Sequence, residues 1–483
     1  MKTNFLEGLD ANIEEAMQKM NVTGSSVVIV KDGKTIYQKS FGYADVRKKQ
    51  PLSVSHYLPI GSASKAFTAT AVVMLAADGL IDLDKPIKEY IPEFELNDSF
   101  ASREATPRDL LCHRTGMPRH EPMWMNWENL DREDLVKNRM KHLFPNAPFR
   151  SIWQYQNHMF AVLGYLVEVV SGKTWENFLE KRIFAPLGMK EYSFCYPDSD
   201  PELRYAKLYT PDEKGKNKEN KAMRFDAMGP AGSIILTPDG LAKWLNFNLS
   251  SGKVGKKQLI APEVFAELHK PNIAYELLPW SFEERFPVGY GLGWFVDSFR
   301  GKKIVEHGGN VNGGTSQVSF IPSENFGCAI LSNADSSMFP DALSSAILDR
   351  YLGFGTEKDW FTAYDSNYKA LIVEMKDQTT AILKTKVADK PFAHTLKEYA
   401  GTYTHPGYGD LTVKVKKGGL HLLYHEDGGY DIDHLHFETF TMNFIEQIIL
   451  PITFITNPEG KVSSVEIPFE LSTPDKPIRF EKK

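Results

Sequence analysis

A serine and a lysine stand three residues apart at the start of an apolar segment. Ser62 and Lys65 open a stretch that is predicted to form a helix over residues 63–78 and to end at Gly79. Residues at this spacing share one face of a helix, so their side chains can meet. The positive end of the helix dipole favours an alkoxide there and disfavours a protonated lysine. The pair can therefore act as nucleophile and general base.

The Ser-x-x-Lys spacing alone is weak evidence, because it occurs at two further places. Ser250 and Lys253 stand in a Ser-Ser-Gly turn, and Ser366 and Lys369 stand in a charged segment. Neither pair precedes a strongly apolar helix. On spacing alone, a helix-capping serine beside an exposed lysine explains Ser62 and Lys65 equally well.

A second motif is Tyr155-Gln156-Asn157, which directly precedes a predicted helix over residues 159–171. Residues two apart on an extended segment point to the same side. There the tyrosine can exchange protons while the asparagine amide binds substrate. The alternative interpretation is an ordinary helix-entry turn with Asn157 as its cap.

The third motif is His307-Gly308-Gly309-Asn310, at the end of a predicted strand over residues 303–307. Two glycines leave a strand edge bare, so a substrate carbonyl can approach the peptide N–H groups closely. A plain Gly-Gly turn is the alternative.

These motifs must be positioned by the strands that the sequence predicts near both ends of the first 355 residues. Residues 25–31 and 34–40 are joined by Asp32-Gly33, a signal for a tight hairpin. Further strands are predicted at 303–307, 315–321 and 327–333, followed by a helix over 341–352. Antiparallel strands drawn from both ends complete one sheet only when the whole segment folds. We therefore predict an α/β fold of the α+β type, an antiparallel sheet flanked by helices, over residues 1–355.

The rest of the chain changes character twice. Residues 356–394 are rich in charge and predict a mostly helical connector. Short alternating strands with glycine turns follow, at 399–403, 411–416, 419–424, 437–444 and 448–455. This spacing is typical of a small all-β barrel, here over residues 395–483. The motifs thus indicate two domains, where length alone suggests about three.

Composition excludes several classes of protein. The 483 residues carry 56 Lys+Arg and 62 Asp+Glu, a net charge of −6, so no basic field is available for nucleic acid or an anionic membrane. Apolar runs such as residues 71–77 are far shorter than the roughly 20 residues of a membrane span. The 3 cysteines cannot build a disulfide framework. A cytoplasmic enzyme or binding protein is expected.

The three motifs, in this order, resemble those of the serine β-lactamase and penicillin-recognising enzyme superfamily. The closest resemblance is to its class C β-lactamase, D-aminopeptidase and esterase branch, the CubicO-type hydrolases. The blocks GSASKAFT (61–68), TPRDLLCHRTGMP (106–118) and GYGLGW (289–294), and the segment 163–189, carry it. The segment that begins YAGTY (399–403) is similar to the lipocalin-like barrel appended to some of these hydrolases.

This resemblance implies roles for the first two motifs. Ser62 would be the acylated nucleophile, and Lys65 would activate it. Tyr155 would relay a proton to the leaving group or activate the deacylating water. Asn157 would hold a substrate carbonyl or amide.

The third motif would complete the site. His307 and Gly309 would bind substrate, and the backbone N–H groups of Ser62 and Asn310 would form the oxyanion hole. Each such donor typically contributes ~3 kcal/mol of transition-state stabilisation. No metal or organic cofactor is implied.

One departure from the family pattern bears on the substrate. His307 stands where the β-lactamase motif has a lysine, and histidine is charged for only part of the time near neutral pH. This disfavours β-lactamase and DD-carboxypeptidase activity. We expect a serine hydrolase that forms an acyl-enzyme with a small-molecule or short-peptide substrate. Peptides that contain D-amino acids or a free N-terminal amino group come first, and carboxylic esters second.

Other roles stay open from the sequence. The chain could be a non-catalytic binding or scaffold module, although an intact Ser62, Lys65 and Tyr155 argue against this. Homo-oligomerisation through the C-terminal domain is compatible with the sequence. His434 and His436, with Asp431 and Asp433 nearby, could be metal ligands, but a polar strand face is favoured. Trp124, Met125 and Trp127 could line a substrate pocket or belong to the core. Cys112 is not expected to act as a nucleophile.

Overall fold

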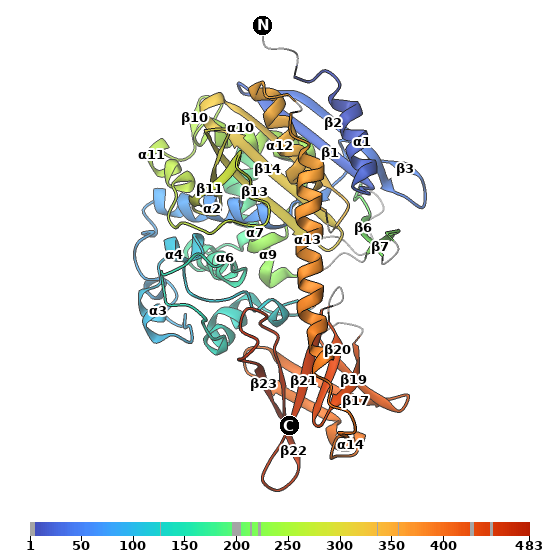
Figure 1. Ribbon diagram of the computed structural model, residues 1–483. Coiled ribbons are helices and arrows are strands. Elements are labelled where there is room, and N and C mark those ends of the chain that lie inside the picture. Colours follow the sequence, from blue (N-terminus) through green and yellow to red (C-terminus); the bar gives the residue numbers. More distant parts are fainter. Residues whose placement is uncertain are drawn as a thin grey trace.

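The structure is a computed structural model of the chain. It describes residues 5–125, 127–195, 204–212, 215–220, 224–335, 337–355, 357–425, 429–444 and 448–483. Figure 1 shows a larger part built around one sheet, a barrel at its lower end, and the long helix α13 (Trp360–Thr380) running alongside from one to the other.

The central sheet joins strands from both ends of the larger part. Its order is β11-β12-β13-β14-β15-β1-β2-β3, and neighbouring strands are antiparallel. The strands are β1 (Gly24–Lys31), β2 (Lys34–Asp45), β3 (Gln50–Pro51), β11 (Arg285–Tyr290), β12 (Phe295–Phe299), β13 (Lys302–Val311), β14 (Gly314–Ile321) and β15 (Phe326–Ser332). β1 pairs with β15, with Ser25 opposite Ser332. The prediction of one antiparallel sheet completed from both ends is therefore confirmed.

The hairpin between β1 and β2 has the predicted two-residue turn. Asp32 and Gly33 have φ angles of 51° and 77°, as a type I′ turn requires.

Both faces of the sheet are covered by helices. Along β1, Val28 belongs to one hydrophobic core and Val27 to the other, because successive side chains point to opposite faces. Helices α2 (Ser64–Ala77) and α6 (His158–Ser171) contribute to the first core. Helices α1 (Leu9–Lys19) and α12 (Phe339–Leu352) contribute to the second.

Shorter elements complete the larger part. The helices are α3 (Ser99–Glu104), α4 (Pro107–Leu111), α5 (Arg132–Asp134), α7 (Trp175–Leu179), α8 (Ala185–Leu187), α9 (Gly229–Gly232), α10 (Pro238–Leu249) and α11 (Pro262–Phe265). Small sheets are formed by β4 (Leu58–Pro59), β8 (Ile235–Leu236) and β5 (Tyr192–Ser193), by β6 (Leu208–Pro211) with β7 (Asn217–Asn220), and by β9 (Lys253–Val254) with β10 (Lys257–Gln258).

The C-terminal strands close into a barrel, as predicted. They are β16 (Gly401–His405), β17 (Gly409–Lys416), β18 (Gly419–Tyr424), β19 (Tyr430–His436), β20 (Thr439–Asn443), β21 (Ile449–Thr456), β22 (Val462–Ile467) and β23 (Ile478–Lys482). Tyr403, Tyr408 and Phe480 are fully buried, so aromatic rings form part of the barrel's core.

The barrel differs from the sequence prediction in detail. The strand patterns did not indicate β19, β22 and β23. Tyr399 ends the short helix α14 (Leu396–Tyr399) and does not begin a strand. A capping box between Thr395 and Glu398 starts that helix.

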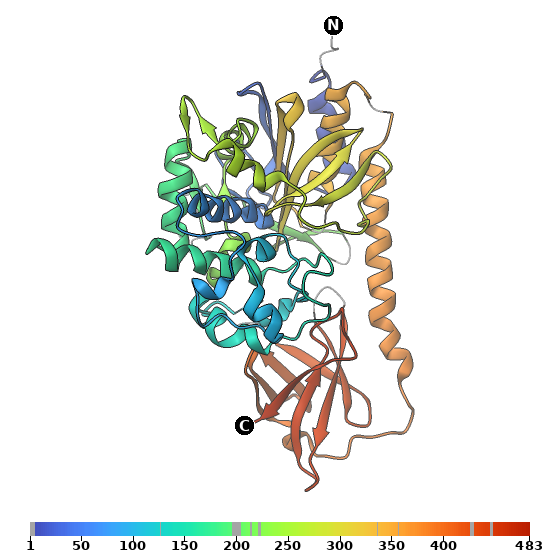
Figure 2. The same ribbon diagram turned by 90° about the vertical axis from the view of Figure 1, so that its left-hand side faces the viewer.

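Helix α13 supplies the predicted helical connector. Its first turns belong to the second core of the larger part, where Trp360 and Tyr364 are buried. In Figure 2 the helix then runs beside the larger part down to the barrel. The domain boundaries themselves, at 355 and 394, stay a prediction.

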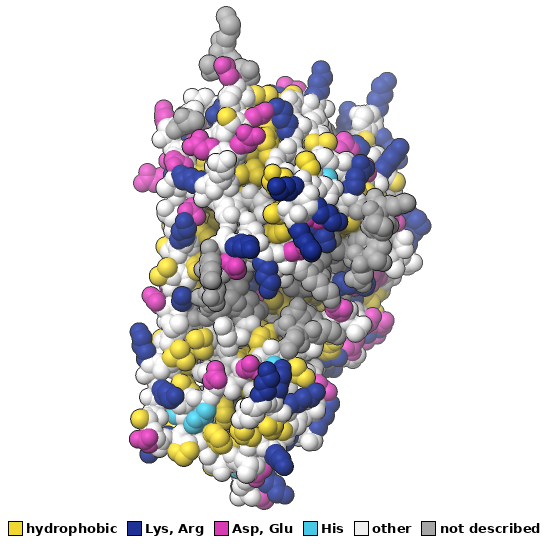
Figure 3. All heavy atoms as spheres, turned by 90° about the vertical axis from the view of Figure 1, so that its right-hand side faces the viewer, with side chains coloured by type: hydrophobic (Ala, Val, Ile, Leu, Met, Phe, Trp, Pro, Cys, Tyr) yellow, Lys and Arg dark blue, Asp and Glu magenta, His cyan; other side chains and the backbone are white. Residues whose placement is uncertain are grey.

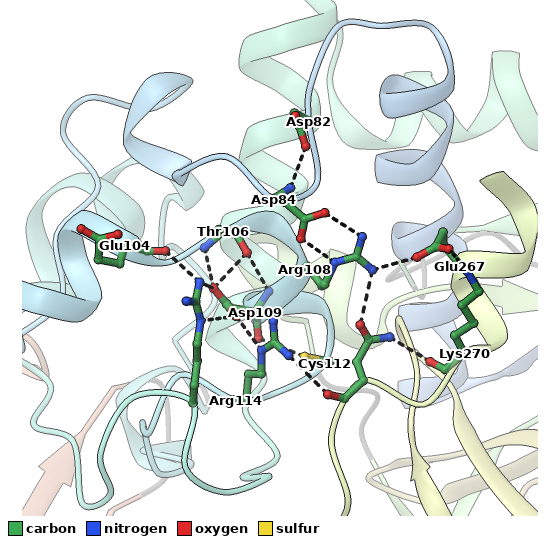
Figure 4. Close-up of polar contacts among 12 residues, drawn as sticks. Asp82, Asp84, Glu104, Thr106, Arg108, Asp109, Cys112, Arg114, Glu267 and Lys270 are labelled. Atoms are coloured by element: carbon green, nitrogen blue, oxygen red, sulfur yellow. Dashed lines mark hydrogen bonds and ion pairs between the residues drawn. The ribbon is translucent and has the colours of Figure 1, made fainter. Parts of the chain in front are cut away.

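A buried carboxylate ties the block over residues 106–118 to the segment that carries the second motif. Asp109 is fully buried and accepts hydrogen bonds from the Thr106 backbone (2.9 Å), from Arg114 (2.6 Å) and from Arg150 (2.7 Å). Figure 4 shows Asp109 between Thr106 and Arg114. Two backbone bonds extend this contact, from Arg150 to Arg114 and from Gln154 to His113. The segment 150–157 is therefore fixed from α4.

Replacing Asp109 tests this anchor. Asp109→Asn leaves two arginines facing a neutral amide, so we expect the free energy of unfolding to fall by about 3 kcal/mol. Urea denaturation at pH 7 measures it. Asp239 supplies the control: its side chain is 53% exposed and pairs with Lys243, so Asp239→Asn should change stability by less than about 0.5 kcal/mol. Equal, small effects of both variants would contradict the assignment.

Candidate active site

A cavity of about 490 Å³ brings parts of all three motifs together. Ser62, at the start of α2, lines it together with Tyr155 and the β13 residues 307–310. Lys65 and Asn157 lie behind this surface and are buried.

Lys65 connects three polar groups of the site. Its Nζ lies 3.1 Å from Ser62 Oγ, 2.7 Å from Asn157 Oδ1 and 2.8 Å from the Ala231 carbonyl of α9. The carbonyl oxygens of Asn157 and Ala231 can only accept hydrogen bonds. A neutral amine uses its two N–H groups on these acceptors, and its lone pair then faces the Ser62 hydroxyl.

Burial favours this neutral form. The pKa of Lys65 is lowered well below its ordinary value, chiefly because the amine is desolvated and also because Arg119 is positive; Glu121 acts in the opposite direction. A lysine whose pKa is lowered in this way is suited to take the hydroxyl proton as a base.

Tyr155 also contacts Ser62. Its hydroxyl hydrogen-bonds to Ser62, and burial raises its pKa, so it is a neutral phenol that can donate a proton. Its ring centroid lies 4.8 Å from Lys65 Nζ.

Asn157 is not a helix cap, although it directly precedes α6. It has helical backbone angles, and its side chain caps nothing. Instead, Oδ1 accepts from Lys65, and Nδ2 donates to Glu121 Oε1 at 2.8 Å. Both ends of the amide are thus occupied by protein partners.

His307 lines the cavity but is fully engaged. Its Nδ1 lies 2.6 Å from the Gly308 carbonyl, so Nδ1 carries the proton and Nε2 accepts from Tyr290 OH at 3.1 Å. Tyr290 belongs to the GYGLGW block, which accounts for that part of the family pattern. Desolvation lowers the pKa of His307 to about 3. The histidine is therefore neutral at physiological pH.

The glycines of the third motif serve the protein's own packing. A Cβ on Gly309 would stand 1.8 Å from the Ile60 carbonyl, and one on Gly61 would stand 2.6 Å from the Asn310 nitrogen. These close approaches bring the turn before Ser62 against β13. One face of Gly309 packs against the Ile60 carbonyl, and substrate binding at Gly309 stays a prediction.

The edge of β13 nevertheless stays open. Its pairing with β12 ends where Phe295 meets Glu306, while residues 307–310 line the cavity. A substrate can therefore lie along this edge beside Ser62, close to the Asn310 N–H proposed for the oxyanion hole.

Aromatic side chains form one wall of the cavity. These are Trp153, Tyr155, Tyr275, Trp280 and Phe295. Trp124, Met125 and Trp127 do not line it. Trp127 packs on His425 of the barrel, with ring centroids 4.4 Å apart.

Acidic groups lie elsewhere on the cavity surface. Glu306 pairs with the buried Arg285 and accepts from Gln317 at 2.9 Å. Asp341, at the start of α12, makes no ion pair with any described residue. Burial raises the pKa values of Asp297 and Asp341 to about 7. This part of the cavity suits a cationic group of a ligand.

Sequence reasoning missed Arg119, Glu121, Ala231 and Asp341. Arg119 and Glu121 lie just beyond the 106–118 block. The pocket residues considered from the sequence in this region were Trp124, Met125 and Trp127. The Ala231 carbonyl leaves no signal in the sequence, since any residue type has one.

The other Ser-x-x-Lys pairs do not form a site. Ser250 Oγ donates to the backbone carbonyl of Lys253 at 2.6 Å, and Lys369 pairs with Asp365 on α13. Cys112 is buried, and desolvation raises its pKa to about 12.

His434 and His436 contact backbone groups. His434 Nε2 lies 3.0 Å from the Phe437 carbonyl, and His436 accepts from the Val387 N–H. Among the described residues, no three His, Cys, Asp or Glu side chains gather as a metal site would require.

The visible surface is mixed in charge. On the face in Figure 3, basic and acidic side chains are interspersed, and hydrophobic ones gather over the barrel end. No helix in the described ranges is both long and apolar enough to cross a membrane.

The chain is similar to known proteins over most of its length. The Beta-lactamase family model matches residues 9–351, and a Domain of unknown function (DUF3471) matches residues 385–482. Unguisins hydrolase ungD' of Aspergillus campestris is 25% identical, over 97% of this chain and 90% of its own length.

Two solved structures share the fold. The octameric penicillin-binding protein homologue from Pyrococcus abyssi has a TM-score of 0.64 at 23% identity, covering 99% of this chain and 100% of its own. D-amino acid amidase from Ochrobactrum anthropi has a TM-score of 0.60 at 23% identity, covering 73% and 98%. Since the family model spans more than half of the chain, this protein belongs to the Beta-lactamase family and is a serine hydrolase.

Proposed function

We propose that Ser62 is the nucleophile of an acyl-transfer reaction and that Lys65 is its general base. The observation that carries this proposal is the position of Lys65 Nζ, which lies 3.1 Å from Ser62 Oγ and donates to the carbonyl oxygens of Asn157 and Ala231. Attack forms a bond from Ser62 Oγ to the substrate carbonyl carbon, and the hydroxyl proton passes to Lys65.

The remaining steps follow from the same contacts. The tetrahedral oxyanion lies between the N–H groups of Ser62 and Asn310. The bond to the leaving group then breaks, and the leaving group takes the proton from Lys65 through the Tyr155 hydroxyl. Water next attacks the acyl-enzyme and gives its proton to Lys65. The acid product leaves, and Ser62 regains its proton.

We propose small amides with a free amino group as substrates, peptides of D-amino acids first among them. The Asp341 carboxyl on the cavity surface supports an ammonium group, and the neutral His307 offers no charge to a substrate carboxylate. A D-amino acid amidase shares the fold, and a curated relative is named a hydrolase of unguisins. Both support this ranking over β-lactamase or DD-carboxypeptidase activity.

Carboxylic esters are the second candidate substrate. The aromatic wall formed by Trp153, Tyr275 and Phe295 would accept an apolar acyl group, which needs no charged partner.

The cellular location and the self-association of the protein are also proposals. We place the protein in the cytoplasm, since its three cysteines are free thiols. We also propose self-association, which the octameric homologue of the same fold supports, and we place it at the barrel.

The first test is covalent labelling of the serine. A fluorophosphonate probe should add one adduct to Ser62, detected by mass spectrometry, and Ser62→Ala should take none. Lys65→Met should slow labelling by roughly 10²- to 10⁴-fold, the usual contribution of a general base. Ser250→Ala and Lys253→Met, which alter the second Ser-x-x-Lys pair, should label at the wild-type rate. A wild-type protein without adduct would refute the mechanism.

Substrate class is tested with matched chromogenic compounds. We expect D-aminoacyl p-nitroanilides to be turned over faster than their N-acetylated forms, because only a free amine can pair with Asp341. We also expect them to be turned over faster than their L-isomers, on the likeness to a D-amino acid amidase. Faster turnover of long-chain p-nitrophenyl esters than of every anilide would reverse the ranking.

The Asp341 carboxyl predicts a pH dependence. Its pKa is raised to about 7, so the group loses its charge as the pH falls through that value. The KM of an aminoacyl anilide should therefore rise below pH 7, while that of a neutral ester should not. Asp341→Asn should raise the anilide KM about 10-fold at pH 8 and remove the effect of pH. An unchanged anilide KM in this variant would exclude the carboxyl from binding.

A further inference from the structure

The barrel contacts the larger part next to the active site. In Figure 2 it lies directly against the segments that precede α6. Among the described residues, four hydrogen bonds cross this contact: His120 N to Glu470, Tyr408 OH with His120, His425 with the Met125 carbonyl, and Asn146 to Ser472.

His120 is the residue that the barrel holds most closely. It is fully buried and has φ 45° and ψ 36°, a left-handed conformation that costs a residue with a side chain some strain. Its N–H donates to Glu470 Oε2 at 2.6 Å. Its Nε2 donates to the Phe144 carbonyl at 2.9 Å, so Nδ1 accepts from Tyr408 OH at 2.7 Å. Both barrel partners thus stabilise an unusual backbone turn.

The two neighbours of His120 belong to the active site. Arg119 lines the cavity, 5.1 Å from the centre of the Tyr155 ring, and pairs with Glu121 at 2.9 Å. Glu121 accepts from Asn157 Nδ2. The left-handed turn at His120 sets the direction in which these two side chains leave the chain.

Glu121 decides how the Asn157 amide is oriented. A carboxylate can only accept, so it holds the NH₂ group and turns Oδ1 toward Lys65. With the amide reversed, Lys65 would lose the acceptor for one N–H group, and its lone pair would no longer be directed at Ser62. A continuous chain of contacts therefore runs from Glu470 through His120, Glu121 and Asn157 to Lys65.

We propose that Glu470 and Tyr408 of the barrel are positioning residues for the hydrolase site, acting through the turn at His120. Glu470 is suited to this role because it is 5% exposed and is itself fixed. Its Oε1 accepts from the backbone N–H and hydroxyl of Ser472, at 3.0 and 2.7 Å. The inference rests on the proposed roles of Ser62 and Lys65.

The variants Glu470→Gln and Tyr408→Phe test this in the full-length protein. A glutamine must present its NH₂ group either to the His120 N–H or to the Ser472 N–H, so one hydrogen bond is lost. We expect Ser62 labelling by the fluorophosphonate, and kcat for a D-aminoacyl anilide, to fall by roughly 10-fold, with a smaller change in KM.

The barrel offers matched controls away from this contact. Glu438 also accepts from a backbone N–H, that of Ala393, and from a tyrosine hydroxyl, that of Tyr399. Tyr403 donates to a buried carbonyl at 2.7 Å. Glu438→Gln and Tyr403→Phe should therefore label Ser62 at the wild-type rate. Thermal unfolding of all four variants shows that each is folded.

A double-mutant cycle distinguishes positioning from general loss of structure. If Glu470 acts through Asn157, Glu470→Gln should slow labelling in the wild type but add little in the Asn157→Ala background. Full additivity, or labelling by Glu470→Gln and Tyr408→Phe at the rate of their controls, would overturn the inference. A wild-type protein that is not labelled at Ser62 would instead refute the proposed function, and this inference with it.

Discussion

The site depends on one buried amine. Lys65 is 0% exposed, and a charged ammonium without a carboxylate partner is costly in such a place. Desolvation lowers the pKa of this amine, and two carbonyl oxygens accept hydrogen bonds from it while Nζ lies 3.1 Å from Ser62 Oγ. The burial of Lys65 therefore suits it to catalysis, because the desolvation that lowers its pKa also makes it a base.

This constraint requires the whole larger part to be folded. The acceptors of Lys65 lie just before α6 and on α9, and Ser62 is held in place by the close approach of Ile60 to Gly309 on β13. β13 in turn belongs to a sheet that β1 and β15 close from opposite ends of the chain. Strands and helices far apart in sequence therefore fix a geometry that spans only a few ångströms.

The third motif shows how a family pattern can persist while its electrostatics change. His307 is neutral, because both ring nitrogens are bonded within the protein and the ring is buried. Charged groups of the cavity lie outside the motif, among them Arg119, Asp341 and the ion-paired Arg285 and Glu306. We propose that these groups select the substrate.

Features that depend on neighbours a few residues apart could be predicted from the amino-acid sequence. These are the Asp32-Gly33 turn, the helices after Ser62 and Asn157, the Ser-Lys spacing and the alternation that predicts a barrel. The partners of Lys65 and the contacts of the barrel with the larger part emerged only from the tertiary structure. The hydrogen bond from Lys65 to the Ala231 carbonyl joins residues that are 166 positions apart in the sequence. The bond from His120 to Glu470 joins residues that are 350 positions apart. Local patterns carry no record of such contacts, because a backbone carbonyl or a buried carboxylate acquires its partner only when distant segments pack together.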